Sequence, residues 1–196
     1  MADKNYRIEG DTLIINDGVT EISTEDFHKY DVNEYYKDLK LKNGIANIKS
    51  IIIPDSVISI GDLAFADCES LENITMPDGV ISIGKGAFSR CYNLESITIP
   101  DSVTSIGNGA FAHSSLKSVI IPESVTNIGN NMFSNCYSLK SISIPNSVIN
   151  IDDYAFNWCT NLTIKCNKGS YAEEFAAKKG IPTKHIKDKT KVIERE

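Results

Sequence analysis

Apolar residues return along most of this chain at a spacing of about 23 residues, with polar turn residues between them. The spacing is marked by five prolines that stand 23, 23, 22 and 23 residues apart, namely Pro54, Pro77, Pro100, Pro122 and Pro145. A valine follows each proline after three residues, an isoleucine after six and a phenylalanine after eleven, as in Val57, Ile60 and Phe65. Matching side chains at a constant period indicate a solenoid in which each unit is one coil and equivalent residues stack in columns.

Each unit is expected to contain two short extended segments joined by turns. The LxxIxI segment before each proline has an apolar residue at every second position, as a strand does, and neighbouring coils would place these strands in parallel. Proline followed by short polar residues, as in Pro54, Asp55 and Ser56, is typical of a corner. A second extended piece, VxxIG, bends at its glycine and leads into a tight helical or 3-10 turn. The pattern therefore predicts a right-handed superhelix with a parallel sheet on one side and short strands and turns on the other.

A worn copy of the repeat precedes the five regular units. In INDGVTEISTEDF, Val19, Ile22 and Phe27 occupy the valine, isoleucine and phenylalanine positions, so six cycles are represented. The following residues 28–47 exceed what one coil needs, and insertions of this kind in a solenoid go to surface loops.

The insertion carries three tyrosines, a residue type enriched in interface hot spots. These candidate contacts are Tyr30, Tyr35 and Tyr36. The alternative is that Tyr35 and Leu39, four residues apart, pack an inserted helix onto the first coils.

Both ends of the array differ from the repeat, as the caps of a solenoid must. Two short apolar runs around Gly10 predict an N-terminal hairpin. Near the other end, Ser170 and Glu173 form a capping box and Gly180 a stop signal, which predicts a short helix with Tyr171 and Phe175 as its anchors. We expect one domain, organised as an N-terminal cap with a degenerate repeat (1–27), an insertion (28–47), the repeats (48–165), a cap helix (166–182) and a charged tail that frays (183–196).

With the markers in place, the consensus reads LxxIxIPxxVxxIGxxAFxxCxxL. This pattern resembles the BspA-type leucine-rich repeat family, a bacterial and protist class with repeats of about 22 to 24 residues. The resemblance covers about residues 48 to 165. It implies a leucine-rich repeat solenoid without catalytic residues, which binds proteins or surfaces and is often displayed outside the cell.

Composition narrows the possible partners. The chain has 196 residues, of which 41% are hydrophobic, so it can bury a core of single-domain size. Its net charge of -6 argues against a nucleic-acid partner, because such proteins usually carry a basic face. The absence of an 18-residue apolar run argues against membrane insertion. The start, MADKNYRIEG, lacks the apolar core of a signal peptide, so the chain as written is expected to be cytoplasmic, although a secreted chain without its signal would look the same.

Four of the five cysteines share one repeat position: Cys68, Cys91, Cys136 and Cys159. Ser114 takes that position in the third unit. A linear column cannot supply the tetrahedron that zinc requires, and a buried column of structural thiols is expected instead. Cys166 lies outside the column and is the candidate for a reactive thiol.

No constellation of catalytic residues is apparent. The three histidines, His28, His113 and His185, occupy unrelated positions, and no phosphate-binding loop or HExxH motif occurs. The acids Asp55, Asp78, Asp101 and Glu123 follow successive prolines, and turn preference accounts for them without calcium. We therefore expect no enzyme activity, no metal and no cofactor.

The outward positions of the predicted sheet are the candidate ligand-binding face, because strand neighbours of inward residues point outward. They are Ser50, Asn73, Thr75, Ser96, Thr98, Ser118, Ile120, Ser141 and Ser143, with Ile52 beside Ser50. The leading interpretation is a binding module for an unidentified protein or cell-surface ligand, of adhesion type. One alternative is a structural spacer without a dedicated ligand. Another is that the rows of Ser and Thr hold ordered water or carbohydrate.

Overall fold

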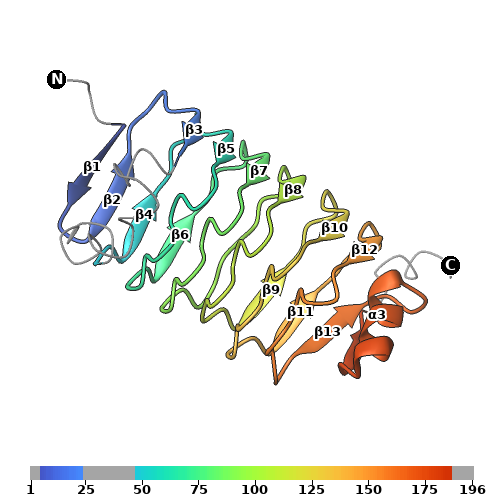
Figure 1. The fold of residues 1–196 in the computed structure, drawn as a ribbon. Helices are drawn as coiled ribbons and strands as arrows, with labels where there is room; N and C mark the ends of the chain where they lie inside the picture. Colours follow the sequence, from blue (N-terminus) through green and yellow to red (C-terminus); the bar gives the residue numbers. More distant parts are fainter. Residues whose placement is uncertain (1–4, 24–46, 187–196) are drawn as a thin grey trace, which may run out of the picture.

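The structure, a computed structural model, describes residues 5–23 and 47–186. Coils stack side by side along one axis, with the hairpin β1 (Tyr6–Glu9) and β2 (Thr12–Ile15) at one end and helix α3 (Tyr171–Lys179) at the other (Figure 1). Each coil contributes one strand or extended segment to each of two rows. The expected solenoid fold is therefore confirmed.

The first row contains the LxxIxI segments and forms two four-stranded sheets, with strand orders β1-β2-β4-β6 and β14-β13-β11-β9. All pairs except β1 with β2 are parallel. The remaining strands are β4 (Ser50–Ile52), β6 (Asn73–Thr75), β9 (Ser118–Ile120), β11 (Ser141–Ser143), β13 (Thr163–Cys166) and β14 (Thr183–His185).

The first row is interrupted at the coil between β6 and β9. Residues 94–100 run through this position without forming a strand, so the expected single sheet is divided in two. The backbone N–H of Lys117 still donates to the carbonyl of Glu95 at 2.9 Å, which links this coil to the next. The interruption precedes the shorter repeat, in which Pro122 follows Pro100 after 22 residues.

The second row consists of the two-residue VxxI segments. It is divided into the parallel sheets β3-β5-β7-β8 and β10-β12. Its strands are β3 (Glu21–Ile22), β5 (Ser59–Ile60), β7 (Ser82–Ile83), β8 (Ser105–Ile106), β10 (Asn127–Ile128) and β12 (Asn150–Ile151). Ile22 lies in register with Ile60, which confirms that the worn copy is a coil of the same solenoid. Phe27 lies outside the described residues.

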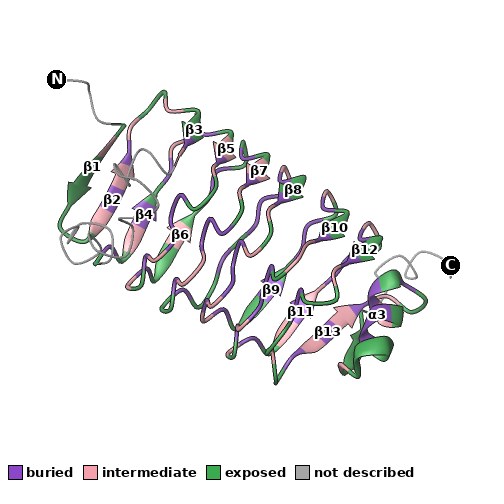
Figure 2. Cartoon of the chain, viewed as in Figure 1, coloured by how far each residue is buried: buried purple, intermediate pink, exposed green. Residues whose placement is uncertain are grey.

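The core is a set of columns that run the length of the solenoid. Five phenylalanine rings stack at centroid distances of 5.5, 5.7, 5.4 and 5.7 Å, from Phe65 through Phe88, Phe111 and Phe133 to Phe156. The inward residues of both strand rows are buried around this stack, as Figure 2 shows in purple. One coil has no core of its own, so stacking supplies the apolar contacts that stabilise it.

The turn after the second row is held by hydrogen bonds between coils. The N–H groups of Leu63, Phe65 and Asp67 donate to the carbonyls of residues 85, 87 and 89 in the next coil, at 2.8, 2.8 and 2.9 Å. Bonds to the third residue back also occur, as from Ala66 to Leu63 at 3.1 Å. The expected helical or 3-10 turn is therefore only part of the arrangement, because every second N–H is directed to the neighbouring coil.

The repeated glycines mark close contacts between coils. A Cβ on Gly84 would lie 2.4 Å from the backbone N of Asp62, and one on Gly107 would lie 2.4 Å from that of Lys85. Neither glycine has positive φ. Glycine is thus required at these positions because the preceding coil leaves no room for a side chain.

A second contact between coils involves the serine two residues after each proline. The hydroxyl of Ser102 donates to the carbonyl of Val80 at 2.6 Å, and Ser147 donates to Val125 at 3.0 Å. Ser56 and Ser124 make the same bond. The second unit has Gly79 in this position instead.

The C-terminal cap helix begins and ends at the predicted capping residues, but only one of its two predicted anchors is buried. The Glu173 N–H donates to the Ser170 hydroxyl, and Gly180 ends the helix with φ of 67°. Phe175 is buried against Phe156, with 6.1 Å between ring centroids. Tyr171, however, is 40% exposed, so its predicted role as an anchor is wrong.

The start of the predicted tail is ordered. β14 (Thr183–His185) pairs in parallel with β13 and extends the sheet, so the expectation that these residues fray is wrong. The short turn after Gly180 returns the chain to the open edge of β13, where backbone groups would otherwise lack partners. Residues 187–196 lie outside the described part of the chain.

Candidate ligand-binding surfaces

The first row brings the predicted face residues together. Ser50 lies beside Asn73 and Ser118 beside Ser141. At the next outward positions of the same strands, Thr75 lies beside Ile52 and Ser143 beside Ile120. We call this surface the sheet face: Ser50, Ile52, Asn73, Thr75, Ser96, Thr98, Ser118, Ile120, Ser141 and Ser143. Ser50, Ser141 and Ser143 are half-buried and the others are exposed. Ser96 and Thr98 lie on the interrupting segment 94–100 and connect the two halves.

The sheet face is uncharged and has two apolar points. Ile52 is 51% exposed and Ile120 is 72% exposed. Their strand neighbours Ile51 and Val119 are buried, which accounts for the outward direction of both side chains.

Charged residues border the sheet face in pairs. Lys49 lies 3.5 Å from Glu72 and Lys117 lies 2.5 Å from Glu95, with both partners exposed in each pair. Exposed pairs of this kind contribute little stability, but they neutralise one another at the edge of the face.

The three candidate tyrosines of the insertion, Tyr30, Tyr35 and Tyr36, lie outside the described residues. The same holds for His28. Their proposed roles therefore stay predictions.

A groove of about 760 Å³ runs across the turns of four successive coils. We call it the turn groove. Its floor is formed by glycine and small side chains, among them Gly109, Ala112 and Ser134. One wall carries Asp62, Lys85 and Asn108, and the opposite wall carries Asp67, Arg90, His113 and Asn135.

The sequence interpretation missed the turn groove because it assigned the turn entirely to folding. A signal was nevertheless present in the residue before each cysteine position, which changes in every unit while its neighbours repeat. These five residues share a left-handed backbone with φ between 59° and 65°: Asp67, Arg90, His113, Asn135 and Trp158. Such a conformation is uncommon for residues other than glycine, and it directs five different side chains to the same edge of the coil.

Neighbouring coils connect the polar side chains of the groove. Arg90 lies 3.4 Å from Asp67, and the Asn135 amide nitrogen lies 3.4 Å from His113 Nε2. The Tyr137 hydroxyl donates to Asn135 Oδ1 at 2.9 Å. The N-terminal half of the groove therefore contains paired charges, whereas the C-terminal half contains amide groups with histidine and tyrosine rings.

The cysteine column is structural. The thiols of Cys91, Cys136 and Cys159 donate to the phenylalanine carbonyls of the preceding coils at 3.1 to 3.3 Å. Burial raises the pKa of Cys68 to about 12 and that of Cys159 to about 12, so both remain thiols near neutral pH.

The reactive role predicted for Cys166 is not supported. Its side chain is fully buried at the end of β13, and burial raises the pKa of its thiol. Reactive cysteines need an accessible thiolate, which this environment disfavours.

In residues 5–23 and 47–186, no group of three His, Cys, Asp or Glu side chains is placed to hold a metal ion. Over the same residues, no helix has the length and apolar character needed to cross a membrane.

The sequence of the repeat identifies the family. The model for the BspA type Leucine rich repeat region matches six copies over residues 42–163, which is more than half of the chain. The chain belongs to the BspA-type leucine-rich repeat family. Leucine-rich repeat proteins typically bind or scaffold other molecules, and BspA-type repeats are generally not enzymes. No curated protein matches the chain.

Solved structures of bacterial leucine-rich repeat proteins are similar to this BspA-type chain. A leucine-rich repeat protein from Eubacterium ventriosum is 28% identical with a TM-score of 0.65, covering 81% of this chain and 40% of that one. A leucine rich cell surface protein from Faecalibacterium prausnitzii is 29% identical with a TM-score of 0.57, covering 85% and 54%. The leucine-rich repeat protein of T. pallidum is 23% identical with a TM-score of 0.62, covering 91% and 94%, and supports the fold alone. The chain thus spans about half or less of the first two proteins.

Proposed function

We propose that this protein is a non-catalytic binding module that captures a protein ligand at a cell surface through the sheet face. The observation that carries the proposal is an uncharged row of small side chains that continues from coil to coil and exposes Ile52 and Ile120. Depletion of charge at the centre and polar groups at the rim are features of protein interfaces.

The chemistry of the face favours recognition by side chains. Backbone groups of β4 and β11 pair with neighbouring strands within the two sheets, so a ligand that covers the middle of either sheet meets side chains rather than free backbone groups. The paired charges around Glu72 and Glu95 provide a polar rim. Similarity to a cell surface protein from Faecalibacterium prausnitzii supports a location outside the cell.

The test places three glutamates on the sheet face, as Thr75→Glu, Thr98→Glu and Ile120→Glu. Capture from a detergent extract of surface-biotinylated epithelial cells is measured against the unchanged protein. We expect capture to fall at least about tenfold, because the three added carboxylates would be buried at the interface without a partner charge.

The matched control carries three glutamates at exposed strand positions of the second row, as Ser105→Glu, Asn127→Glu and Asn150→Glu. It should capture as the unchanged protein does, and circular dichroism should show both variants folded. Equal capture by both variants, or no saturable capture by the unchanged protein, would contradict the proposal and favour a structural spacer.

A further inference from the structure

Amide side chains gather at the C-terminal half of the turn groove and beside the neighbouring hollow of the terminal coil. Each lies on the turn side of the third, fourth or fifth regular coil: Asn108, Asn130, Asn131, Asn135 and Asn157. The equivalent walls of the first two regular coils carry the ions Asp62, Asp67, Lys85 and Arg90 instead. The groove therefore changes from charged to uncharged hydrogen-bonding groups along the solenoid.

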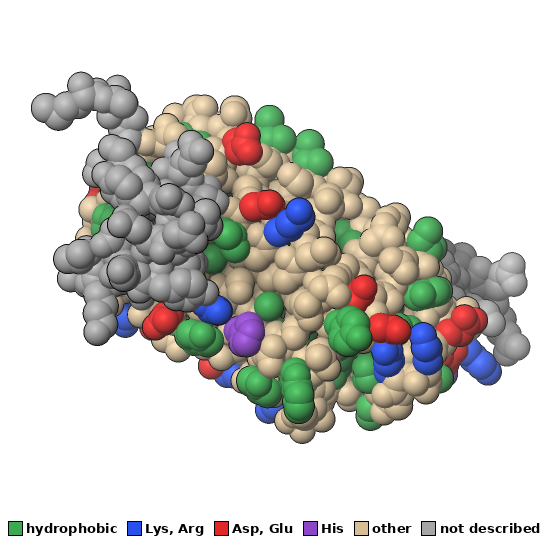
Figure 3. Space-filling view, viewed as in Figure 1, with side chains coloured by type: hydrophobic (Ala, Val, Ile, Leu, Met, Phe, Trp, Pro, Cys, Tyr) green, Lys and Arg blue, Asp and Glu red, His purple; other side chains and the backbone are tan. Residues whose placement is uncertain are grey.

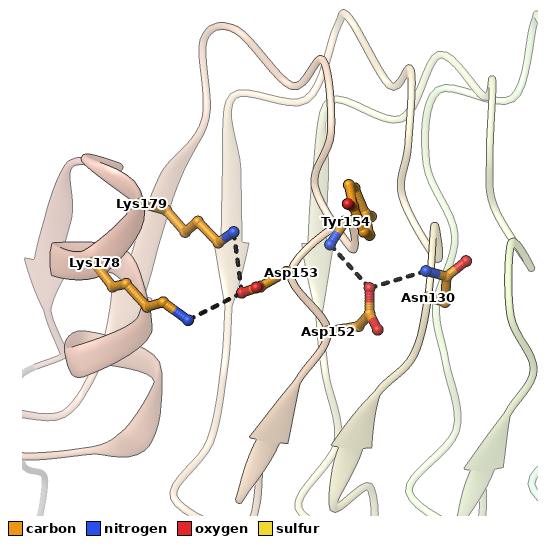
Figure 4. A network of polar contacts seen from close by, with 6 residues as sticks. All are labelled: Asn130, Asp152, Asp153, Tyr154, Lys178 and Lys179. Carbon is orange, nitrogen blue, oxygen red and sulfur yellow. Dashed lines mark hydrogen bonds and ion pairs between the residues drawn. The ribbon is translucent and has the colours of Figure 1, made fainter.

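Several of these amides are held in place by hydrogen bonds between coils or within one coil. Asn108 Oδ1 accepts from the Asn130 N–H at 3.1 Å, and the Asn130 amide donates to Asp152 at 3.0 Å (Figure 4). Asn135 is fixed between the Tyr137 hydroxyl and the Ser134 hydroxyl, each 2.9 Å away. Groups that are fixed before a ligand arrives lose less conformational entropy when it binds.

Exposed aromatic rings lie beside the amides. Tyr137 is 59% exposed, Tyr154 is 58% exposed and Trp158 is 63% exposed. Tyr154, Asn157 and Trp158 line a second hollow of about 400 Å³ on the terminal coil, next to Asp153 and Lys179. Large rings of this kind present apolar faces that a ligand can cover by stacking.

The carboxylates near this half are already balanced. Asp153 lies 3.3 Å from the ammonium of Lys178 and 3.0 Å from that of Lys179, and Asp152 accepts from Asn130 and the Tyr154 N–H (Figure 4). On the face seen in Figure 3, charged side chains of both signs gather at the α3 end, while the middle is mainly uncharged. Positive charge is not in excess among these residues, so the site does not favour a polyanion.

The backbone of the turn also disfavours an extended peptide. The N–H groups of Gly109, Phe111 and His113 already donate to the next coil at 2.9, 3.0 and 2.8 Å. Gly109, Ala112 and Ser134 line this half of the groove, so it offers small residues rather than large apolar ones to the side chains of a peptide.

We propose that the C-terminal half of the turn groove, together with the neighbouring hollow of the terminal coil, binds a neutral oligosaccharide. Sugar hydroxyls both donate and accept hydrogen bonds, as the amide groups of asparagine do. The apolar C–H face of a sugar ring stacks on tyrosine and tryptophan rings. This site is separate from the sheet face and does not depend on the function proposed for it.

The test uses the only tryptophan of the chain, Trp158, as a built-in fluorescent reporter. The probes are the hexasaccharides of cellulose, xylan, mannan and chitin, and a heparin-derived hexasaccharide serves as the anionic comparison. We expect at least one neutral hexasaccharide to shift the Trp158 emission to shorter wavelength in a saturable way, because it removes water from the ring.

Two variants remove ligand groups without disturbing the left-handed positions: Tyr137→Ala and Asn157→Ala. Each should weaken the binding by about tenfold in calorimetry. The matched control is Tyr92→Ala, since Tyr92 occupies the repeat position of Tyr137 in the charged half of the solenoid and should leave affinity unchanged.

The outcomes separate this proposal from the preceding one. The variant with three glutamates on the sheet face should bind the hexasaccharide normally. The proposal is overturned by an unchanged Trp158 emission with all four neutral probes at millimolar concentration, by tighter binding of the heparin fragment, or by full affinity in both groove variants.

Discussion

Two columns of the same coil, one buried in the core and one half-buried at the surface, differ in how much variation they accept. The phenylalanine column is the same residue in all five regular units and stacks at nearly constant distance. The column just before the cysteine position keeps an equally constant backbone but has an acid, a base, a histidine, an amide and an indole in turn. The buried column therefore admits one side chain only, whereas the half-buried column accepts side chains of different chemistry on the same backbone.

Phe111→Ala, in the buried column, should cause the largest loss of stability. Phe111 is fully buried between Phe88 and Phe133, so its removal leaves a cavity in the middle of the stack. We expect the free energy of unfolding in urea to fall by about 3–5 kcal/mol. The control Trp158→Ala, which is in the variable column and whose side chain is 63% exposed, should stay within about 0.5 kcal/mol of the original protein. Similar losses in both variants would show that the two columns do not differ in this way.

Gly107→Ala should have an intermediate effect. The added methyl group would meet the backbone of the preceding coil, and the coils would have to separate. Overpacking of this kind destabilises by about 1–3 kcal/mol, measurable by urea unfolding.

Gly79→Ser is the matched control for that substitution. A Cβ on Gly79 would lie 3.3 Å from the Asp55 carbonyl oxygen and 3.6 Å from that of Val57, so the contact is tight but far less so than at Gly107. The other four units have a serine that bonds to the carbonyl equivalent to that of Val57. We expect this variant to be as stable as the original or more stable, by up to about 1 kcal/mol. If Gly107→Ala is equally well tolerated, the spacing of the coils is not the reason for glycine.

The smallest expected effect concerns exposed charges at the C-terminal cap. The Gly169 N–H and the His185 ring hold the pKa of Glu173 below its usual value. A depressed folded-state pKa stabilises the protein above the unfolded value near 4.5, and the contribution is lost as the pH falls through the folded value. The thermal midpoint should therefore decline below about pH 4.5.

Glu173→Gln should reduce this acid-dependent decline, while Glu174→Gln, on the same turn of α3, should leave it unchanged. Scanning calorimetry at pH 3 to 6 measures both. Identical pH profiles for the two variants would mean that the contact between Glu173 and His185 does not stabilise the cap.

Much of the fold could be predicted because the coils stack in order along the chain. Residues one repeat apart in the sequence therefore lie in the same column of the structure. The strands, the buried phenylalanines, the thiol column and the helix stop at Gly180 all follow from local patterns that recur or from capping signals. The pairing of β14 with β13 could not be predicted, since the tail has little apolar content and its order depends on a backbone edge created by the fold.

The candidate surfaces were predictable to different degrees. The sheet face followed from strand alternation, because outward positions are fixed once Ile142 and its equivalents are placed inside. The turn groove required the structure, because its walls combine residues that are about 22 positions apart and depend on left-handed φ values. For Cys166 the sequence was misleading. Its place outside the repeat suggested a thiol accessible to solvent, but the folded C-terminal cap buries it.

The coil-to-coil hydrogen bonds of the turn have an electrostatic consequence. From Leu63 onward to Asn135, the bonded N–H groups all point toward the C-terminal coil and the carbonyls toward the N-terminal one. Peptide dipoles that share one direction add, as they do along a helix. The row of turns therefore contributes a dipole whose positive end faces the terminal coil, where the carboxylates of Asp152 and Asp153 lie. The second row opposes it, because N–H groups such as that of Gly107 donate to the preceding coil, in this case to the Ile83 carbonyl at 2.8 Å.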